Sequence, residues 1–309
     1  MGAAVTDLTI NVAGIDFANP VLLASGTCNY GEELRALTDL SRLGGVVSKT
    51  ITPRPRSGNP PPRVVETAAG MLNAIGLQNP GIDAFIAHRW PVLQALGTRV
   101  IVNIAGDTPT EFAVLAARLS ELPGITALEL NISCPNVHAG GMLFGADPAA
   151  AAAVVTAVRH ATRLPVIAKL TPNVTDITAV ARAVADAGAD AVSLINTLVG
   201  MAVDVERRRP VLANVTGGLS GPAIKPVALA MVWKVRSAVR VPIIGIGGIA
   251  TARDALEFLV AGASLVQVGT ATFVDPDAGR TVVEGLAIYC RDQGIHQLRS
   301  LVGSLQTGR

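Results

Sequence analysis

The chain has 309 residues, half of which are hydrophobic, and its formal net charge is only +2. No uninterrupted apolar stretch approaches the roughly 20 residues that a membrane-spanning helix needs. Aromatic side chains make up only 3% of the chain, too few to build a stacking surface for bases. We therefore expect a soluble protein that binds neither membranes nor nucleic acid.

The first residues, "MGAAVTDLTINVAG", lack the basic start and the long apolar stretch of a secretory signal. Three cysteines, Cys28, Cys134 and Cys290, are too few and too scattered for a disulfide framework. No Cys-x-x-Cys pair offers a site for zinc or an iron–sulfur cluster. A cytoplasmic protein without a metal centre of its own is the expectation.

Short β-branched runs alternate along the chain with longer Ala-rich amphipathic stretches, which is typical of repeated βα units. The length fits one (β/α)8 barrel, about 250 residues in the usual case, so we predict a single barrel domain over 1–309. The runs are nearly continuous in apolar character, as expected for strands buried on both faces. The predicted strands are 21–25, 45–49, 100–104, 127–131, 166–170, 191–196, 243–247 and 265–269.

The stretches between these strands have helical character, and several begin at Asp or Thr and end at Gly. Two segments do not fit this alternation. Residues 52–81 are rich in Pro and Gly, and residues 197–221 precede the helix before the seventh strand. We expect both to be long loops over the C-terminal face of the barrel, where they would cover an active site.

Polar residues stand at the ends of the predicted strands, the part of such a barrel that carries the chemistry. Buried lysines are costly unless each faces an anion or a hydrogen-bonding ligand. The pattern therefore predicts one polar cavity. The residues at the strand ends are Ser25, Lys49, Asn103, Asn131, Lys169, Asn196, Gly247, Gly248, Gly269 and Thr270.

Glycine-rich turns follow the seventh and eighth strands in "GIGGIAT" and "VGTATF", and "TGGLSGPAIKP" adds another directly before a helix. Barrels commonly hold a phosphate group on backbone N–H groups at this place. The turns therefore predict a phosphorylated cofactor or substrate.

Cys134 lies in "NISCPNVHAGG", just beyond the fourth strand. A thiol in such a loop can act as a nucleophile or as a general base, and the spacing does not separate the two. His138 is the neighbour that could activate it, but nothing in the sequence orients that ring, so we interpret it as solvated.

Several motifs together resemble the catalytic subunit of class 1B dihydroorotate dehydrogenases, over nearly the whole chain. They are "NISCPN" with "VHAGGMLFGADP", "SKTIT", "GMLNAIGLQNPG", and "GIGGI" with "DALEFLVAGASLVQVGTATF". The resemblance implies bound FMN and oxidation of dihydroorotate to orotate in pyrimidine biosynthesis. It assigns Cys134 as the base that removes the carbon-5 proton while hydride passes from carbon 6 to the flavin.

The resemblance also implies the residues of the site. The implied substrate ligands are Lys49, Asn73, Ala74, Ile75, Gly76, Leu77, Asn131, Asn136, Asn196 and Thr197. The implied FMN ligands are Ser25, Gly26, Lys49, Thr50, Asn103, Asn131, Lys169, Ile195, Gly221, Gly247, Gly248, Gly269 and Thr270.

A class 1B chain implies a partner, an electron-transfer subunit that carries FAD and a 2Fe-2S cluster and passes electrons to NAD. The resemblance further implies a homodimer of this chain within a heterotetramer. His138 departs from the family's pattern, because a lysine commonly follows the valine there; this affects only what can be said of the loop.

Three other interpretations stay open. One is a homodimeric class 1A-like enzyme that uses fumarate. Another is a flavin-free phosphate-binding aldolase or isomerase with a Schiff base on Lys169, which would leave Cys134 without a role. The third is a barrel without catalytic function that binds a partner protein.

Overall fold

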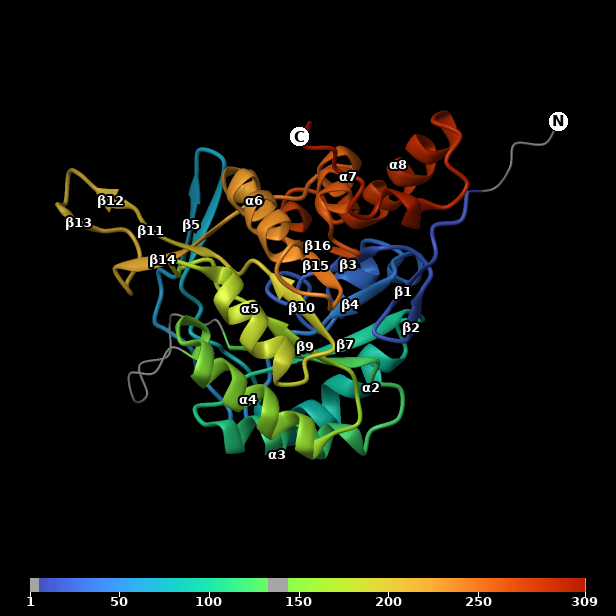
Figure 1. The fold of residues 1–309 in the computed structure, drawn as a ribbon. Coiled ribbons are helices and arrows are strands. Elements are labelled where there is room, and N and C mark those ends of the chain that lie inside the picture. The colour runs from blue at the N-terminus through green and yellow to red at the C-terminus, as the bar shows by residue number, and fades with distance from the viewer. Residues whose placement is uncertain (1–5, 133–143, 309) are drawn as a thin grey trace.

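The computed structural model describes residues 6–132 and 144–308. Its centre is a closed barrel of eight parallel strands, which confirms the predicted (β/α)8 fold (Figure 1). All eight strands coincide with predicted segments to within two residues at either end. In chain order they are β3 (Val21–Leu23), β4 (Gly45–Val47), β7 (Arg99–Ile104), β8 (Ala127–Asn131), β9 (Val166–Lys169), β10 (Ala191–Leu194), β15 (Ile243–Ile246) and β16 (Leu265–Val268).

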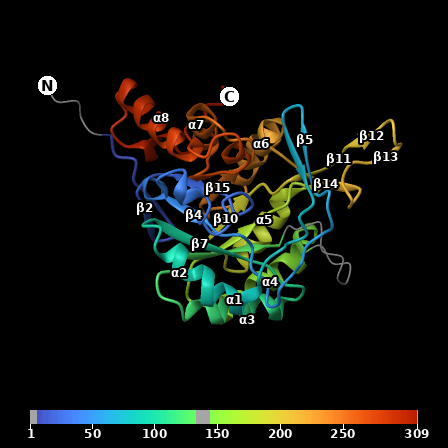
Figure 2. The same ribbon diagram turned by 180° about the vertical axis from the view of Figure 1, so that it is seen from behind.

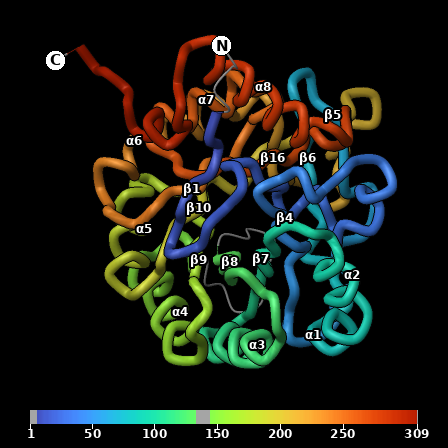
Figure 3. Tube along the Cα trace, turned by 90° about the vertical axis from the view of Figure 1, so that its right-hand side faces the viewer, coloured from blue at the N-terminus to red at the C-terminus, as the bar shows by residue number. Residues whose placement is uncertain are grey.

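Helices surround the barrel as an outer ring (Figure 3). Several begin where the sequence predicts them, because Asp147, Asp176 and Thr251 each accept a hydrogen bond from a backbone N–H in the first turn. The helices are α1 (Gly81–Ala84), η3 (Phe85–Arg89), α2 (Trp90–Gln94), α3 (Pro109–Ser120), α4 (Pro148–Ala161), α5 (Ile177–Asp186), α6 (Lys225–Arg236), α7 (Ala252–Ala261) and α8 (Ala278–Asp292). Shorter 3₁₀ turns are η1 (Leu34–Ala36), η2 (Leu40–Arg42), η4 (Phe144–Ala146), η5 (Pro222–Ile224), η6 (Thr270–Phe273) and η7 (Leu298–Leu301).

The first βα unit departs from the prediction of eight regular repeats. Between β3 and β4 the chain forms only η1 and η2, and Asp39 begins the second of these turns by accepting from the Ser41 N–H. Helix α8 packs against β3 instead, and Gly279 leaves room there for Leu23 and Leu43. The last helix thus covers the first strand and completes the ring.

A short hairpin closes the amino-terminal end of the barrel (Figure 3). It consists of β1 (Ile10–Val12) and β2 (Ile15–Phe17), which pair antiparallel. Its buried side chains Ile10, Val12 and Phe17 pack against one residue from each barrel strand, such as Leu22 and Val47. This end is therefore filled with apolar side chains and leaves the opposite end for a site.

The two segments expected to be loops lie over the C-terminal end, but they are not irregular. They meet in a four-stranded antiparallel sheet of order β11–β14–β6–β5, beside which the hairpin β12–β13 projects (Figures 1 and 2). The strands are β5 (Val64–Thr67), β6 (Gly70–Asn73), β11 (Leu198–Met201), β12 (Val203–Asp204), β13 (Arg209–Pro210) and β14 (Thr216–Ser220).

This sheet joins insertions that are far apart in the sequence. Asn73 pairs with Gly218 and Leu72 with Leu219, and the side chains of Leu72, Ala74 and Leu212 form a small core of their own. Glycine permits the close pairing, since a Cβ at Gly70 would overlap the carbonyl oxygen of Ser220. Among the described helices, none combines the length and apolar character needed to cross a membrane.

Candidate active site

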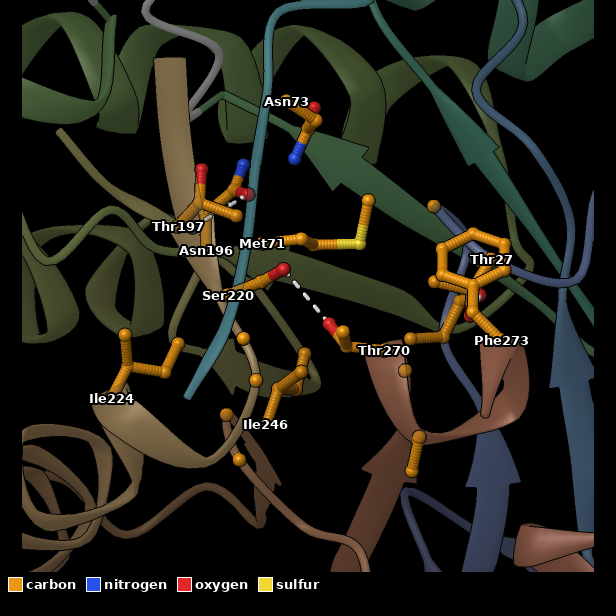
Figure 4. Close-up of a pocket in the computed structure, with 18 of the residues that line it drawn as sticks. Thr27, Met71, Asn73, Asn196, Thr197, Ser220, Ile224, Ile246, Thr270 and Phe273 are labelled. Atoms are coloured by element: carbon orange, nitrogen blue, oxygen red, sulfur yellow. Dashed lines mark hydrogen bonds between the residues drawn. The ribbon is translucent and has the colours of Figure 1, made fainter. Parts of the chain in front are cut away.

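A cavity of about 1020 Å³ lies between the carboxyl ends of the barrel strands and the overlying sheet (Figure 4). It brings together most of the residues that the sequence places in a site. Those lining it are Ser25, Gly26, Lys49, Thr50, Asn73, Ile75, Gly76, Leu77, Asn131, Lys169, Ile195, Asn196, Thr197, Gly221, Gly247, Gly248, Gly269 and Thr270.

Two predicted site residues do not line the cavity. Ala74 is fully buried, and its side chain packs in the small core beneath the sheet. Asn103 is also fully buried, since it points into the barrel and donates from Nδ2 to a carboxylate oxygen of Glu129 at 2.6 Å. Cys134 and Asn136 lie outside the described residues.

One end of the cavity is formed by glycines that let backbone segments come close together. Gly221 and Gly248 have φ angles of 95° and 72°, and a Cβ on Gly248 would lie 2.9 Å from the carbonyl oxygen of Gly221. Thr270 donates from its hydroxyl to Ser220 Oγ at 2.8 Å (Figure 4). Hydroxyls and backbone N–H groups at this end suit a phosphate group.

An ion-pair cluster behind these glycines fixes the helices that follow them. Lys225, the first residue of α6, lies 2.6 Å from Asp254 and 3.0 Å from Glu257 of α7. Asp254 also completes a capping box with Thr251. The start of α7 is therefore bound both to its own preceding turn and to α6, which holds the glycine turns in place.

Asn73, Asn196 and Thr197 supply polar side chains to another part of the cavity (Figure 4), which Lys49 also lines. Asn73 donates from Nδ2 to the carbonyl of Gly218 at 3.3 Å, which links its position to the sheet. Burial lowers the pKa of the Lys49 ammonium below its usual 10.5, and the nearby Arg63 cation adds to that shift. A desolvated cation and several amides that line one cavity suit a planar ligand that carries a carboxylate and carbonyl groups.

The floor of the cavity holds a second lysine, which is almost completely buried. Lys169 is 6% exposed, and its Nζ lies 3.5 Å from Ser25 Oγ and 3.4 Å from Glu129 Oε1. Sequence reasoning missed Glu129. A signal existed, because "ALELN" places a carboxylate in a strand predicted to be buried on both faces.

The rim of the cavity contains residues that the strand ends could not reveal. Val64, Met71 and Phe273 come from the sheet and from η6, and Phe273 is 60% exposed. The adjacent Val274 is 88% exposed. Val64 and Met71 reach the rim through the pairing of the two insertions, which local sequence patterns do not specify.

Comparison with known proteins agrees with this architecture. The model of the dihydroorotate dehydrogenase family matches residues 7–289. The chain belongs to this family. It is 58% identical over 300 residues to the dihydroorotate dehydrogenase B (NAD(+)) catalytic subunit of Pelobacter propionicus, covering 97% of this chain and 99% of the relative.

Two further relatives carry the same name. The protein of Geotalea uraniireducens is 58% identical over 301 residues, with 97% of this chain and 99% of the relative covered. The protein of Geobacter sulfurreducens is 56% identical over 300 residues, with 97% and 98% covered. As a member of the dihydroorotate dehydrogenase family, the chain thus aligns with such subunits over almost its full length.

Proposed function

We propose that this chain is the catalytic subunit of a dihydroorotate dehydrogenase, which oxidises dihydroorotate to orotate in pyrimidine biosynthesis with FMN bound in the cavity. One observation carries the proposal: a single cavity joins a glycine-lined end suited to phosphate with two lysines and a group of amides. The names of relatives that align over nearly the full chain support the same reaction.

The residues present fit FMN. Gly26 lines the cavity, and a Cβ built there would meet no other described atom within 4 Å, so the space beside it is open to a ligand. Gly221, Gly247, Gly248, Gly269 and Thr270 would hold the phosphate.

Bound FMN would supply the acceptor for the hydride that leaves the substrate. The chain's own residues would hold the substrate ring: Lys49 would pair with the carboxylate, while Asn73, Asn131 and Asn196 would bind carbonyl and N–H groups. Cys134 follows Asn131 by three positions, and we assign it as the base that takes the carbon-5 proton.

We further propose that electrons leave through a partner subunit that carries FAD and a 2Fe-2S cluster and reduces NAD, with a homodimer of this chain at the centre of a heterotetramer. The words "NAD(+)" and "catalytic subunit" in the relatives' names support an NAD-linked assembly over the fumarate-using alternative.

A flavin-free aldolase or isomerase is less well supported by the cavity. A Schiff base on Lys169 would have to form at an Nζ that already lies 3.4 Å from a Glu129 carboxylate oxygen and 3.5 Å from Ser25 Oγ, and it would leave Cys134 without a role.

The test is an anaerobic mixing experiment. Dihydroorotate should bleach the flavin absorbance of the purified yellow protein, and NAD should restore it only when the partner subunit is present. A colourless protein that takes up no FMN, or a flavin that dihydroorotate never bleaches, contradicts the proposal. Reoxidation by fumarate without a partner would favour the class 1A alternative.

The base is tested separately by Cys134→Ser, with Cys290→Ser as the matched control at a buried thiol. Cys134→Ser should retain FMN and bind orotate, yet reduce the flavin about 10²- to 10⁴-fold more slowly, the usual contribution of a general base. Its optimum should move to higher pH, because a hydroxyl is a weaker acid than a thiol. Unchanged flavin reduction would remove Cys134 from this role.

A further inference from the structure

The middle of the barrel contains a carboxylate that the proposed reaction does not use. Glu129 on β8 is 0% exposed. Three other strands, β7, β10 and β16, supply donors to it across the barrel interior: Asn103 Nδ2 at 2.6 Å, Ser193 Oγ at 2.9 Å and Gln267 Nε2 at 2.9 Å. A fourth strand supplies Lys169, whose Nζ lies 3.4 Å from Oε1.

These contacts fit an ionised carboxylate. All four neighbours donate, and only a carboxylate without a proton is purely an acceptor. A buried charge must be paired to be tolerated, and Lys169 is the cation that meets Glu129 in the described part of the chain. The ammonium group of Lys169 therefore interacts with the Glu129 carboxylate and also lines the cavity.

Only one member of this ion pair reaches the site. Lys169 lines the cavity, whereas Glu129 lies behind it and is absent from the lining. Ser25, which also lines the cavity, lies 3.5 Å from the same Nζ. The carboxylate thus acts on a ligand through the ammonium group and through the electric field in a poorly solvated interior.

We propose that Glu129 is a positioning residue that holds Lys169 against the cavity floor, and that its negative charge lowers the tendency of the bound flavin to accept electrons. The inference rests on the proposed binding of FMN. Reduction adds negative charge to the flavin, which a fixed cation favours. A buried anion next to that cation offsets part of this effect.

The substitution Glu129→Gln removes the charge and retains the shape. The new amide adds N–H donors at a position where the neighbouring groups already donate, but two of the neighbouring side-chain amides can turn to accept from it. Asn103 Oδ1 and Gln267 Oε1 are buried acceptors without partners in the described residues. Rotation of either amide by half a turn would present an oxygen to the new NH₂ group. The matched control is Ser193→Ala, which removes one donor to Glu129 and keeps every charge.

The measurement is the midpoint potential of the bound flavin, obtained by anaerobic titration against a reference dye. Glu129→Gln should favour reduction at least tenfold over the unaltered protein, a rise of about 30 mV for a two-electron couple. Sulfite, which adds to flavin as an anion, should bind tighter by a similar factor. Ser193→Ala should change both quantities less than threefold. A Glu129→Gln potential that is unchanged or lower, or an equal shift in Ser193→Ala, overturns the inference.

An experiment on the apoprotein keeps the inference testable if Glu129→Gln fails to retain FMN. Lys169→Met leaves Glu129 buried without its cation, so the urea midpoint of unfolding should fall. Adding Glu129→Gln to Lys169→Met should recover part of that loss, since both charges are then gone. A double variant no more stable than Lys169→Met alone contradicts the pairing.

The two proposals fail in different ways. If the purified chain takes up no FMN, the proposed function fails, and the apoprotein cycle alone decides whether Glu129 and Lys169 are coupled. If the chain binds FMN and is reduced by dihydroorotate while Glu129→Gln leaves the potential unmoved, only the inference about Glu129 fails.

Discussion

Thr52 and Asn79 are joined by two hydrogen bonds that run in opposite directions. The Thr52 N–H donates to Asn79 Oδ1 at 3.2 Å, and Asn79 Nδ2 donates to Thr52 Oγ1 at 2.7 Å. Asn79 also accepts from the Gly81 N–H and donates to the Leu77 carbonyl. Both side chains are buried. This contact joins the segment that follows Lys49 to the loop that carries Leu77. Lys49 and Leu77 both line the cavity.

The first prediction concerns this contact. Asn79→Ala should lower the free energy of unfolding by about 2–3 kcal/mol, because it leaves buried backbone and hydroxyl groups without partners. Orotate should bind about tenfold more weakly, since Leu77 and Gly76 lose their anchor. Urea unfolding and orotate titration of the flavin spectrum measure the two effects. The control is Asn11→Ala at an exposed asparagine, where stability should change by less than about 0.5 kcal/mol. Equal losses in both variants would contradict the anchoring role.

The second prediction separates backbone strain from crowding at the phosphate end. Gly248 and Gly294 have similar φ angles, 72° and 65°. A Cβ on Gly248 would lie 2.9 Å from the carbonyl oxygen of Gly221, whereas a Cβ on Gly294 would meet no described atom within 4 Å. Gly294→Ala should therefore cost about 1–2 kcal/mol of stability from strain alone and leave FMN affinity unchanged. Gly248→Ala should lose at least tenfold in FMN affinity as well. Fluorescence titration of the apoprotein with FMN checks this, and equal affinities for the two variants would argue against phosphate binding at Gly248.

The barrel could be predicted from the sequence because each of its strands is a short, nearly continuous apolar run, a signal that lies within a few consecutive residues. The same logic places Lys49, Lys169 and Asn131 at one end, since the carboxyl ends of parallel strands meet there. The sheet over the cavity could not be predicted in this way. Pairing of Asn73 with Gly218 joins segments 145 positions apart, and the glycines at the contact carry no apolar pattern. Both the strand-end pattern and the resemblance predict Asn103 in the site, yet its side chain turns toward Glu129, an orientation that depends on the side chains of several strands in the barrel interior.

The third prediction concerns thiol reactivity. Burial raises the pKa of the Cys28 thiol to about 12, and Cys28 Sγ lies 2.9 Å from the Val47 carbonyl oxygen. Burial also raises the pKa of Cys290. Thiolate is the reactive form, so iodoacetamide near neutral pH should leave both cysteines unmodified in the native protein. Peptide mass spectrometry should find label at Cys134, if it is the base, and orotate should protect it. Label on Cys28 before unfolding would contradict the burial argument.

The fourth prediction follows from the lowered pKa of Lys49. Because burial and the Arg63 cation both disfavour the charged form, the ammonium loses its proton below the usual pH for lysine. A neutral amine cannot pair with the substrate carboxylate. The orotate dissociation constant should therefore rise as pH increases through this lowered pKa. Lys49→Met should bind orotate weakly at every pH. Any pH dependence that remains in this variant comes from groups other than the Lys49 amine, such as those of orotate itself.

The variant Arg63→Met tests the direction in which the Lys49 pKa is shifted. Removing a neighbouring cation lets Lys49 keep its proton to higher pH, so the loss of orotate binding should move upward in pH. Arg253→Met, at an exposed residue of α7, should leave the pH profile of orotate binding in place.

The free energy of unfolding should change with pH in the opposite direction to orotate affinity. The folded state gives up the Lys49 proton at lower pH than the unfolded chain does, so this group's unfavourable contribution to folding is fully present below its folded pKa. That contribution is relieved as pH rises toward 10.5. Orotate affinity that falls with pH while this contribution to stability rises would assign both effects to the same ammonium. A profile that Arg63→Met leaves unmoved would show that another group controls the binding.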